Sequence, residues 1–493
     1  MSSTSPTDPP AKPSRLRRYL VRALFLVACL ATLIATLFIV EKYRGRAAWR
    51  AYETEAKARG VKLDFADYIP PKIPDAENFA SIPLFEAVFR ASDAGQPIPN
   101  PLKLPVPTRG KLPKFNDPAK QERIDLAAWQ KFFVEAKLLP AAGDSAAADV
   151  LQALAGFATP LAQLRDAGTR PHCHFPIHWE KAFAAALPHL EILQSASKLF
   201  ALRLSAHLAL GDSAAAYEDF RTGLRLATAT AEEPTLIAGL VRLATVTAME
   251  NAVWGGLAGQ QWAEPELRKI EADLAGLDGL KDYLFALGSE RGGSNQMTDM
   301  LIGDPRQFAA LMPAMAETPS STWGSSAFPS GWLYQNKVRA NHFFDESAAR
   351  IDPGQRRYFG ERPIPSSATH LTSLPARLYY MLFCLSSPVV ESLEKRWIQA
   401  ATVTDQTRLA CALERFRLAR GAFPQALSEL APDFLPAVPA EIVNGEPYRY
   451  RRTDDGSFAL HSVGTDLRDD GGVIVPMANA SKQADWVWRY PAK

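Results

Sequence analysis

The chain has 493 residues, of which 47% are hydrophobic, 22% charged and 10% aromatic, so it is not a disordered polymer and carries enough apolar material for several cores. At roughly 100–200 residues per domain, the length predicts two to four units. Its 55 Lys and Arg against 53 Asp and Glu give a net charge of +2, which argues against a nucleic-acid binder. The four cysteines, at 29, 173, 384 and 411, form no CxxC pair, so they indicate neither a disulfide framework nor a cysteine-built zinc site.

Residues 23–40 are 18 consecutive residues without a charge, and they predict one transmembrane helix. As a helix this segment is about 27 Å long, close to the thickness of the hydrocarbon core of a bilayer. Tyr19 and Tyr43 are placed to lie at the two interfaces. The alternative is a cleaved signal peptide, but the apolar run is longer than a typical h-region and no small-x-small cleavage site follows it. We therefore expect a retained signal-anchor that spans the membrane once.

The positive-inside count is almost balanced across this segment, so the orientation rests on other features. We expect residues 1–18 to be a disordered cytoplasmic tail, because they are short, polar and rich in Pro, Ser and Thr. With residues 19–43 as the anchor, the long C-terminal part then lies on the far side of the membrane, since long domains translocate largely regardless of charge.

Residues 44–122 predict a juxtamembrane helix that ends at Gly60, an extended stretch, a short helix over about 84–91 and a proline-rich wrap. The wrap holds seven prolines, which exclude a regular helix or a central strand. They are at positions 97, 99, 101, 105, 107, 113 and 118.

Residues 123–290 predict an α-helical hairpin domain, either a hairpin array or a solenoid. One helix is predicted from an apolar stripe that consists of Ile192, Ala196, Leu199, Leu202 and Ala206. This helix ends at Gly211, and Asp212 and Ser213 are placed to cap the next helix. Residues 264–287 predict a further helix.

Residues 291–404 predict an irregular connection with helices near 305–315 and 332–349. The apolar run over 378–385 is short and is followed by Pro388, so it predicts a buried core helix that Pro388 interrupts. A second membrane span is the alternative.

Residues 405–493 predict a small α+β module, which makes the expected fold class mainly α with a C-terminal α+β part. A helix continues to Gly421, and a short helix follows with Leu427 and Leu430 as its docking residues. Two alternating segments flank an Asp-Gly turn at 455–456, which is a strong β-hairpin signal.

The strings ALERFRLARGAFPQALSEL, NGEPYRYRR and HSVGTDLRDDGG resemble the C-terminal head of the major pseudopilin of type II secretion systems. A related domain occurs on membrane-anchored bacterial proteins of unknown function. The resemblance covers under a fifth of the chain, and its most specific part is SVGTD followed by DDGG. It implies the fold of the head and a calcium loop in which backbone carbonyls and two aspartates bind the ion. The matching aspartates here are Asp466 and Asp485.

Asp469 and Asp470 bring further carboxylates to the same loop, and Ca²⁺ takes six to eight oxygen ligands, with glycines freeing the backbone. The alternative is a solvated acidic turn whose side chains cap local N–H groups. The chain departs from the pseudopilins elsewhere, because its apolar helix lies more than 360 residues before the head and no prepilin-peptidase site precedes it. Filament assembly by the usual route is therefore not expected.

The densest group of transition-metal ligands is RPHCHFPIHWE, which contains His172, Cys173, His174 and His178. Imidazole and thiolate suit zinc or copper, but no second ligand cluster exists, so packed or solvent-facing side chains are the alternative. The chain contains no HExxH, GxSxG, P-loop, GxGxxG or EF-hand motif.

These features predict a single-pass protein of the bacterial inner membrane that acts as a non-catalytic scaffold or interaction protein. Its bulk is expected in the periplasm or outside the cell, in contact with the lipid bilayer and with envelope proteins. A metal-dependent enzyme with a site among the helices, and an accessory component of a type II secretion or pilus-like system, are the alternatives.

Overall fold

The computed structural model describes residues 15–105, 112–114, 122–304, 329–472 and 485–489. The protein is mainly helical, with small sheets near the C-terminus and a long apolar N-terminal helix, as the composition and periodicity predict. The helix expected near 305–315, and Pro107 and Pro118 of the proline-rich wrap, lie outside the described residues.

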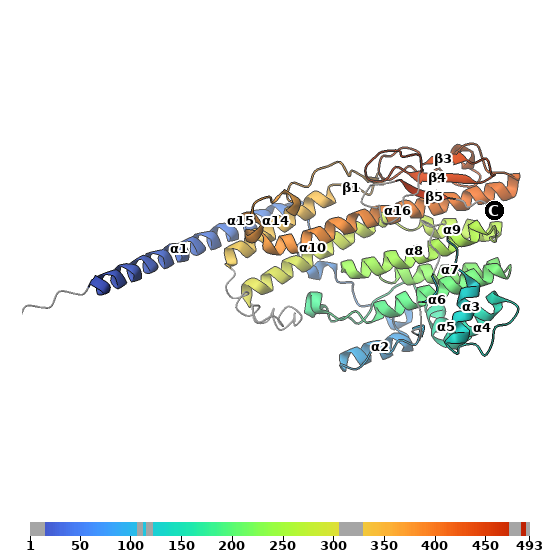
Figure 1. Cartoon of the computed structure of the whole chain (residues 1–493), viewed down its shortest axis with the longest axis horizontal. Coiled ribbons are helices and arrows are strands. Elements are labelled where there is room, and N and C mark those ends of the chain that lie inside the picture. Colours follow the sequence, from blue (N-terminus) through green and yellow to red (C-terminus); the bar gives the residue numbers. More distant parts are fainter. Residues whose placement is uncertain (1–14, 106–111, 115–121, 305–328, 473–484, 490–493) are drawn as a thin grey trace, which may run out of the picture.

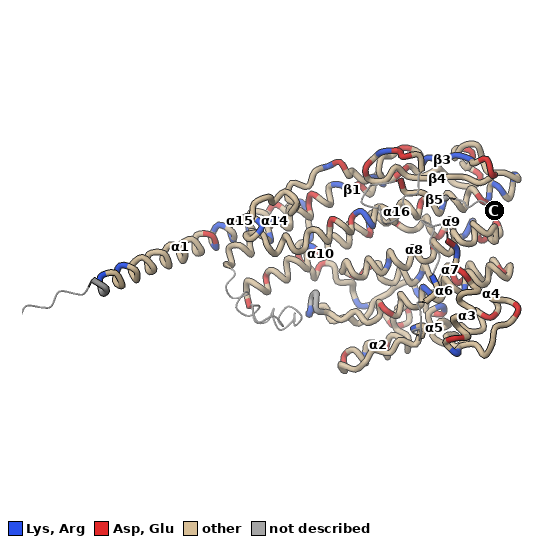
Figure 2. The backbone as a smooth tube through the Cα atoms, in the orientation of Figure 1, with Lys and Arg blue, Asp and Glu red and all other residues tan. Residues whose placement is uncertain are grey.

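α1 (Arg15–Ala58) is one continuous helix of 44 residues that projects from one end of the molecule (Figure 1). It is long and apolar enough to cross a membrane, and none of its most apolar window is buried. Figure 2 shows this segment as a stretch without charged residues, with charges at both ends. Beyond Glu41 the same helix packs along α14 (Ser330–Ala348). The expected juxtamembrane helix is therefore a direct extension of the apolar one.

Four short helices form a layer on one side of the body (Figure 1). Asp125 and Ser145 cap two of them by accepting hydrogen bonds from backbone N–H groups three residues on. Pro83 begins the first helix, where its missing N–H costs nothing. The four helices are α2 (Pro83–Asp93), α3 (Leu126–Glu135), α4 (Ala146–Leu154) and α5 (Ala158–Ala167).

α6 (His189–Ala209) and α7 (Ser213–Thr228) form the helical hairpin that the sequence predicts. All five residues of the predicted stripe are buried. The Asp212 side chain accepts a hydrogen bond of 2.9 Å from the backbone N–H of Ala215, which confirms the predicted cap. α8 (Leu236–Ala258) packs against both helices. It too is long and apolar enough to cross a membrane, but half of its apolar window is buried in the body.

The helices after α8 correct the expected boundaries. Residues 264–287 form two helices, α9 (Glu264–Ala275) and α10 (Gly279–Gly303), because Gly276 ends the first and Asp278 caps the second. α10 continues to residue 303, so it covers the start of the segment 291–404, where the sequence predicts an irregular connection. Its small and polar residues there, Asn295 among them, are buried against neighbouring segments, and this packing outweighs their low helix propensity.

A short β-hairpin of β1 (Ile351–Asp352) and β2 (Arg357–Tyr358) follows α14. α15 (Leu374–Tyr379) then leads into α16 (Met381–Arg420), a helix of 40 residues that contains Pro388 without a break. The prediction that Pro388 interrupts the helix is therefore wrong. The prediction of a buried helix over 378–385 is wrong in part, because Leu378 and Leu385 are exposed while Phe383 is buried.

The C-terminal module contains the predicted hairpin, with β3 (Arg449–Arg452) and β4 (Phe458–Ser462) antiparallel. β5 (Trp486–Arg489) adds to the other edge of β4, so the sheet order is β3-β4-β5. Leu427 and Leu430 are buried, as expected of docking residues. The core continues from α3–α9 through α16 into this sheet, so the module shares one core with the helices. The predicted domain boundaries after residues 290 and 404 fall inside helices, because α10 and α16 run through them without a break.

Candidate functional site

Three metal-ligand side chains converge in the C-terminal module: His461, Asp469 and Asp485. His461 lies on β4, Asp469 lies in the loop that follows, and Asp485 directly precedes β5. The pairing of Ser462 on β4 with Trp486 on β5 brings His461 and Asp485 close together. Each residue offers one ligand atom, and these atoms lie within 4.8 Å of one another.

Backbone groups hold the two carboxylates in place. His461 Nε2 lies 3.0 Å from Asp469 Oδ1 and 3.7 Å from Asp485 Oδ2. The N–H of Gly471 donates to Asp469 Oδ1 at 2.9 Å, and the N–H of Gly472 donates to Asp485 Oδ2 at 2.7 Å. The hydrogen bond from His461, followed by that from Gly471, holds the pKa of Asp469 below its usual value.

Two polar atoms of this group are buried without a hydrogen-bond partner among the described residues. They are Asp485 Oδ1 and His461 Nδ1, on side chains that are almost fully buried. Asp469 is 42% exposed and opens the group to solvent. A buried carboxylate oxygen without a partner is costly, and a cation at the group would satisfy it. Two carboxylates and an imidazole suit divalent cations.

The four aspartates of the predicted calcium loop separate into two pairs. Asp469 and Asp485 belong to the group around His461. Asp466 instead accepts a hydrogen bond of 3.2 Å from the N–H of Arg468, and Asp470 is exposed. Sequence reasoning missed His461, although it directly precedes the SVGTD run.

The His172–178 segment packs as an extended strap beside residues 77–79. His172 forms an isolated parallel bridge with Asn78, and the N–H of Phe79 donates to the His172 carbonyl at 2.8 Å. The Asn78 side chain also binds both backbone groups of His174, each at 2.9 Å. The backbone of this segment is therefore held in place.

The side chains of the strap point to different partners. His178 Nδ1 lies 3.0 Å from Glu180 and its Nε2 lies 3.2 Å from Asp93. Burial raises the pKa of the Cys173 thiol and lowers that of His174. Within the described part of the chain, the four predicted ligands form no group like that at His461. The zinc or copper site predicted for them stays a prediction.

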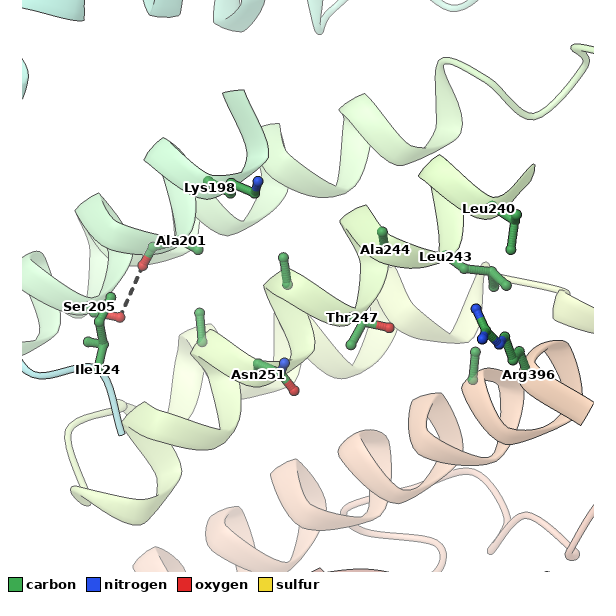
Figure 3. Close-up of a pocket in the computed structure, with 13 residues that line it drawn as sticks. Ile124, Lys198, Ala201, Ser205, Leu240, Leu243, Ala244, Thr247, Asn251 and Arg396 are labelled. Carbon is green, nitrogen blue, oxygen red and sulfur yellow. Dashed lines mark hydrogen bonds between the residues drawn. The ribbon is translucent and has the colours of Figure 1, made fainter. Parts of the chain in front are cut away.

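A cavity of about 430 Å³ lies over α8, between α6 and α16 (Figure 3). Leu240, Leu243, Ala244, Thr247 and Ala248 recur at helical spacing on α8 and form its floor. The small side chains of Ala244, Thr247 and Ala248 leave the hollow. Other residues that line it are Ile124, Ala201, Ser205, Asn251, Ala252 and Ala400.

Two cations flank this apolar groove. Lys198 projects from α6 and Arg396 from α16, on opposite walls (Figure 3). Arg396 lies toward the Leu240 end, whereas Ser205 and Ile124 lie at the other end. Neither cation forms an ion pair with a described residue, and both are exposed. Mostly apolar pockets of roughly 300–1,000 Å³ with a few polar groups are typical of small-molecule sites. Sequence patterns do not reveal this groove, because most of its residues come from three helices that are distant in the chain.

No family model, curated protein or solved structure matches this chain. The protein is therefore described by its fold and its candidate sites. It is mainly helical, with a long apolar N-terminal helix, an apolar groove with two cationic flanks, and a small sheet that carries three side chains of metal-ligating types.

Proposed function

We propose that this protein is a single-pass, membrane-anchored binding protein without a catalytic role. The uncovered apolar part of α1 supports the anchor, and the continuity of α1 into the body supports a rigid connection between the bilayer and the helices. The orientation proposed from the sequence places the body on the far side of the cytoplasmic membrane of a bacterial cell.

Two measurements test the anchor and its orientation. The full chain stays in the membrane pellet after alkaline carbonate washing if α1 spans the bilayer, and release into the supernatant overturns the anchor. A protease added outside spheroplasts digests the body if the body is periplasmic. Digestion that requires lysis overturns the orientation and leaves the anchor intact.

The groove is the observation that carries the binding role. An apolar floor removes the chain of an amphiphile from water, and two cations without ion-pair partners among the described residues attract a negative head group. A long-chain fatty acid combines these two properties in a single small molecule. We propose that the groove binds such a fatty acid, with its carboxylate at one of the two cationic flanks, Lys198 or Arg396.

Displacement of a dansyl-labelled undecanoic acid from the full chain in nanodiscs of neutral lipid tests this assignment. Saturable binding above that of empty discs is expected, and the methyl ester should bind more weakly. Removing both charges with Lys198→Gln and Arg396→Gln should weaken binding roughly tenfold or more. Lys395→Gln is the matched control, because Lys395 is exposed next to Arg396 but does not line the groove.

The variant Ala244→Trp tests the floor of the groove without changing its charge. Ala244 is exposed, so the indole fills the hollow without entering the core. Loss of binding in this variant supports the proposal. Equal binding in all variants, or equal affinity for the methyl ester, overturns it.

The group around His461 supports a second role, the binding of a divalent cation by the C-terminal module. Isothermal titration of the full chain in detergent with Ca²⁺, Mn²⁺ and Zn²⁺ separately tests it. Asp485→Asn should abolish binding of whichever ion binds. His461→Gln distinguishes the ions, because Ca²⁺ needs only the oxygens, whereas Zn²⁺ depends on the imidazole. Absence of binding by all three ions overturns this role.

A further inference from the structure

The start of α16 and the preceding α15 expose an unusual number of large apolar side chains. They follow one another at intervals of three and four residues, so they share one face of the helical segment. The five residues, with exposed fractions, are Leu374 (69%), Leu378 (53%), Met381 (38%), Leu385 (66%) and Val389 (55%). We call this face the 374–389 patch.

The opposite face of the same segment is part of a core. Phe383 and Val390 are buried and belong to the cluster that also contains Tyr283 and Phe343. The segment is therefore fixed by one face while the patch stays uncovered by the described residues. Monomeric soluble proteins rarely leave large apolar side chains contiguous at the surface, and such a patch marks an interaction site.

The α15 end of the patch lies where the apolar part of α1 ends, whereas α16 leads from there into the body, with Phe383 packed against Phe343 of α14 (Figure 1). The Tyr379 hydroxyl donates a hydrogen bond to Glu41 Oε1, and Glu41 is the first charged residue after the uncharged run 23–40. α14 approaches the same point, since a Cβ on Gly331 would lie 2.5 Å from the carbonyl carbon of Glu41. The Trp332 and Tyr379 rings are in contact, tilted by 50° with their centroids 5.3 Å apart. Figure 1 shows α15 beside α1 at this end of the body.

We propose that the α15 end of the 374–389 patch, formed by Leu374 and Leu378, rests on the bilayer as a second, non-spanning membrane contact. This inference depends on the membrane anchor of the proposed function: if residues 23–40 fill the hydrocarbon core, Glu41 lies at the interface and Tyr379 lies there with it. Apolar side chains at this depth insert among the lipids. Tyr379, Tyr380 and Arg377 are residue types that favour the head-group level. The contact would also fix the tilt of the body against the membrane.

Photo-crosslinking to lipid distinguishes this contact from the anchor. p-Benzoylphenylalanine is placed singly at Leu30, Leu378 or Leu418 of the full chain. The protein is reconstituted in phosphatidylcholine vesicles, and lipid adducts are measured by mass spectrometry. Leu418 is the matched control, because it is an exposed leucine near the far end of α16. All three positions are exposed, so the substitution should not disturb the fold.

Lipid adducts at Leu30 and Leu378 but not at Leu418 are expected. An adduct at Leu30 without one at Leu378 overturns the membrane contact and leaves the anchor intact. No adduct at Leu30 overturns the anchor itself. Adducts of Leu378 with protein rather than lipid show that a second copy or another protein covers the patch, and this too overturns the proposal.

Discussion

Glu250 on α8 and Thr404 on α16 are joined inside the protein by a hydrogen bond of 2.6 Å, which the Thr404 hydroxyl donates to Glu250 Oε1. Glu250 is fully buried, and its other carboxyl oxygen has no partner among the described residues. Burial raises the pKa of Glu250 to about 8, although the hydrogen bond from Thr404 opposes this shift. The two long helices are thus joined by a carboxyl that is protonated at neutral pH.

Glu250 should make the stability of the protein fall as the pH rises. The unfolded carboxyl has the ordinary pKa of 4.5, so between about pH 4.5 and 8 the folded state binds more protons than the unfolded state. The stabilisation is complete below pH 4.5 and is lost as the pH rises through about 8, for a total of roughly 3–6 kcal/mol. Urea unfolding in detergent at pH 5, 7 and 9 measures it.

Glu250→Gln should remove most of this pH dependence, because the amide cannot ionise. The exposed Glu86→Gln is the control and should leave the slope unchanged. Burial raises the pKa of Glu290 to about 7 and also raises that of Asp219, so a smaller slope should persist in this variant. An unchanged slope in the Glu250→Gln variant would contradict this account.

The crossing of α1 and α14 depends on two glycines, Gly45 on α1 and Gly331 on α14. A Cβ on Gly331 would lie 2.6 Å from the carbonyl oxygen of Glu41, so Gly331→Ala forces the helices apart. We expect a loss of about 1–3 kcal/mol, typical of overpacking, together with faster proteolysis between α1 and the body. Gly156→Ala is the matched control, since a Cβ there meets nothing within 4 Å. Thermal unfolding and limited trypsin digestion check both variants, and equal behaviour would show that the crossing is not tight.

Asp219 on α7 is a buried anion that holds the α6–α7 hairpin together with α5. It lies 3.1 Å from Arg165, 3.2 Å from Arg203 and 3.7 Å from His207, and it is 1% exposed. Burial raises its pKa, whereas Arg203, His207 and Arg165 oppose this shift.

Asp219→Ala leaves Arg165 and Arg203 without their common partner and should cost about 3 kcal/mol. Glu218→Ala is the control, because Glu218 pairs with Arg221 at the surface and such pairs contribute about 0–1 kcal/mol. Chemical unfolding of the two variants should therefore give clearly different midpoints. Similar midpoints would mean that the buried cluster contributes no more than a surface pair.

The parts of the fold that the sequence predicts correctly depend on neighbours in the chain. The α6–α7 turn follows from Gly211 and the Asp212 cap, and the β-hairpin follows from its Asp-Gly turn, because these signals act over a few residues. α1 follows from its uncharged run. Each of these signals is complete within its own segment.

The features that were missed depend on contacts between distant segments. Pro388 lies within α16 because buried Phe383 and Val390 hold both sides of it in one core, and local propensity does not record that packing. His461 joins Asp485 only through the pairing of β4 with β5. The groove needs three helices at once. A single sequence shows the residues of such sites but does not show that they lie close together in the fold.

Alanine substitutions at two adjacent glycines distinguish the effect of backbone strain from the effect of displacing His461. Gly471 and Gly472 have φ angles of +77° and +69°, so alanine is strained equally at either position. Only at Gly472 would a Cβ also collide with the imidazole, at 2.8 Å from His461 Nδ1, whereas at Gly471 it meets nothing within 4 Å. Gly472→Ala should therefore displace His461 and weaken cation binding by about tenfold or more relative to Gly471→Ala, at a similar cost in stability. Titration calorimetry with the bound ion, beside thermal unfolding of both variants, checks this. If the two variants bind the ion equally well, His461 is not a ligand and the cation is held by the carboxylates alone.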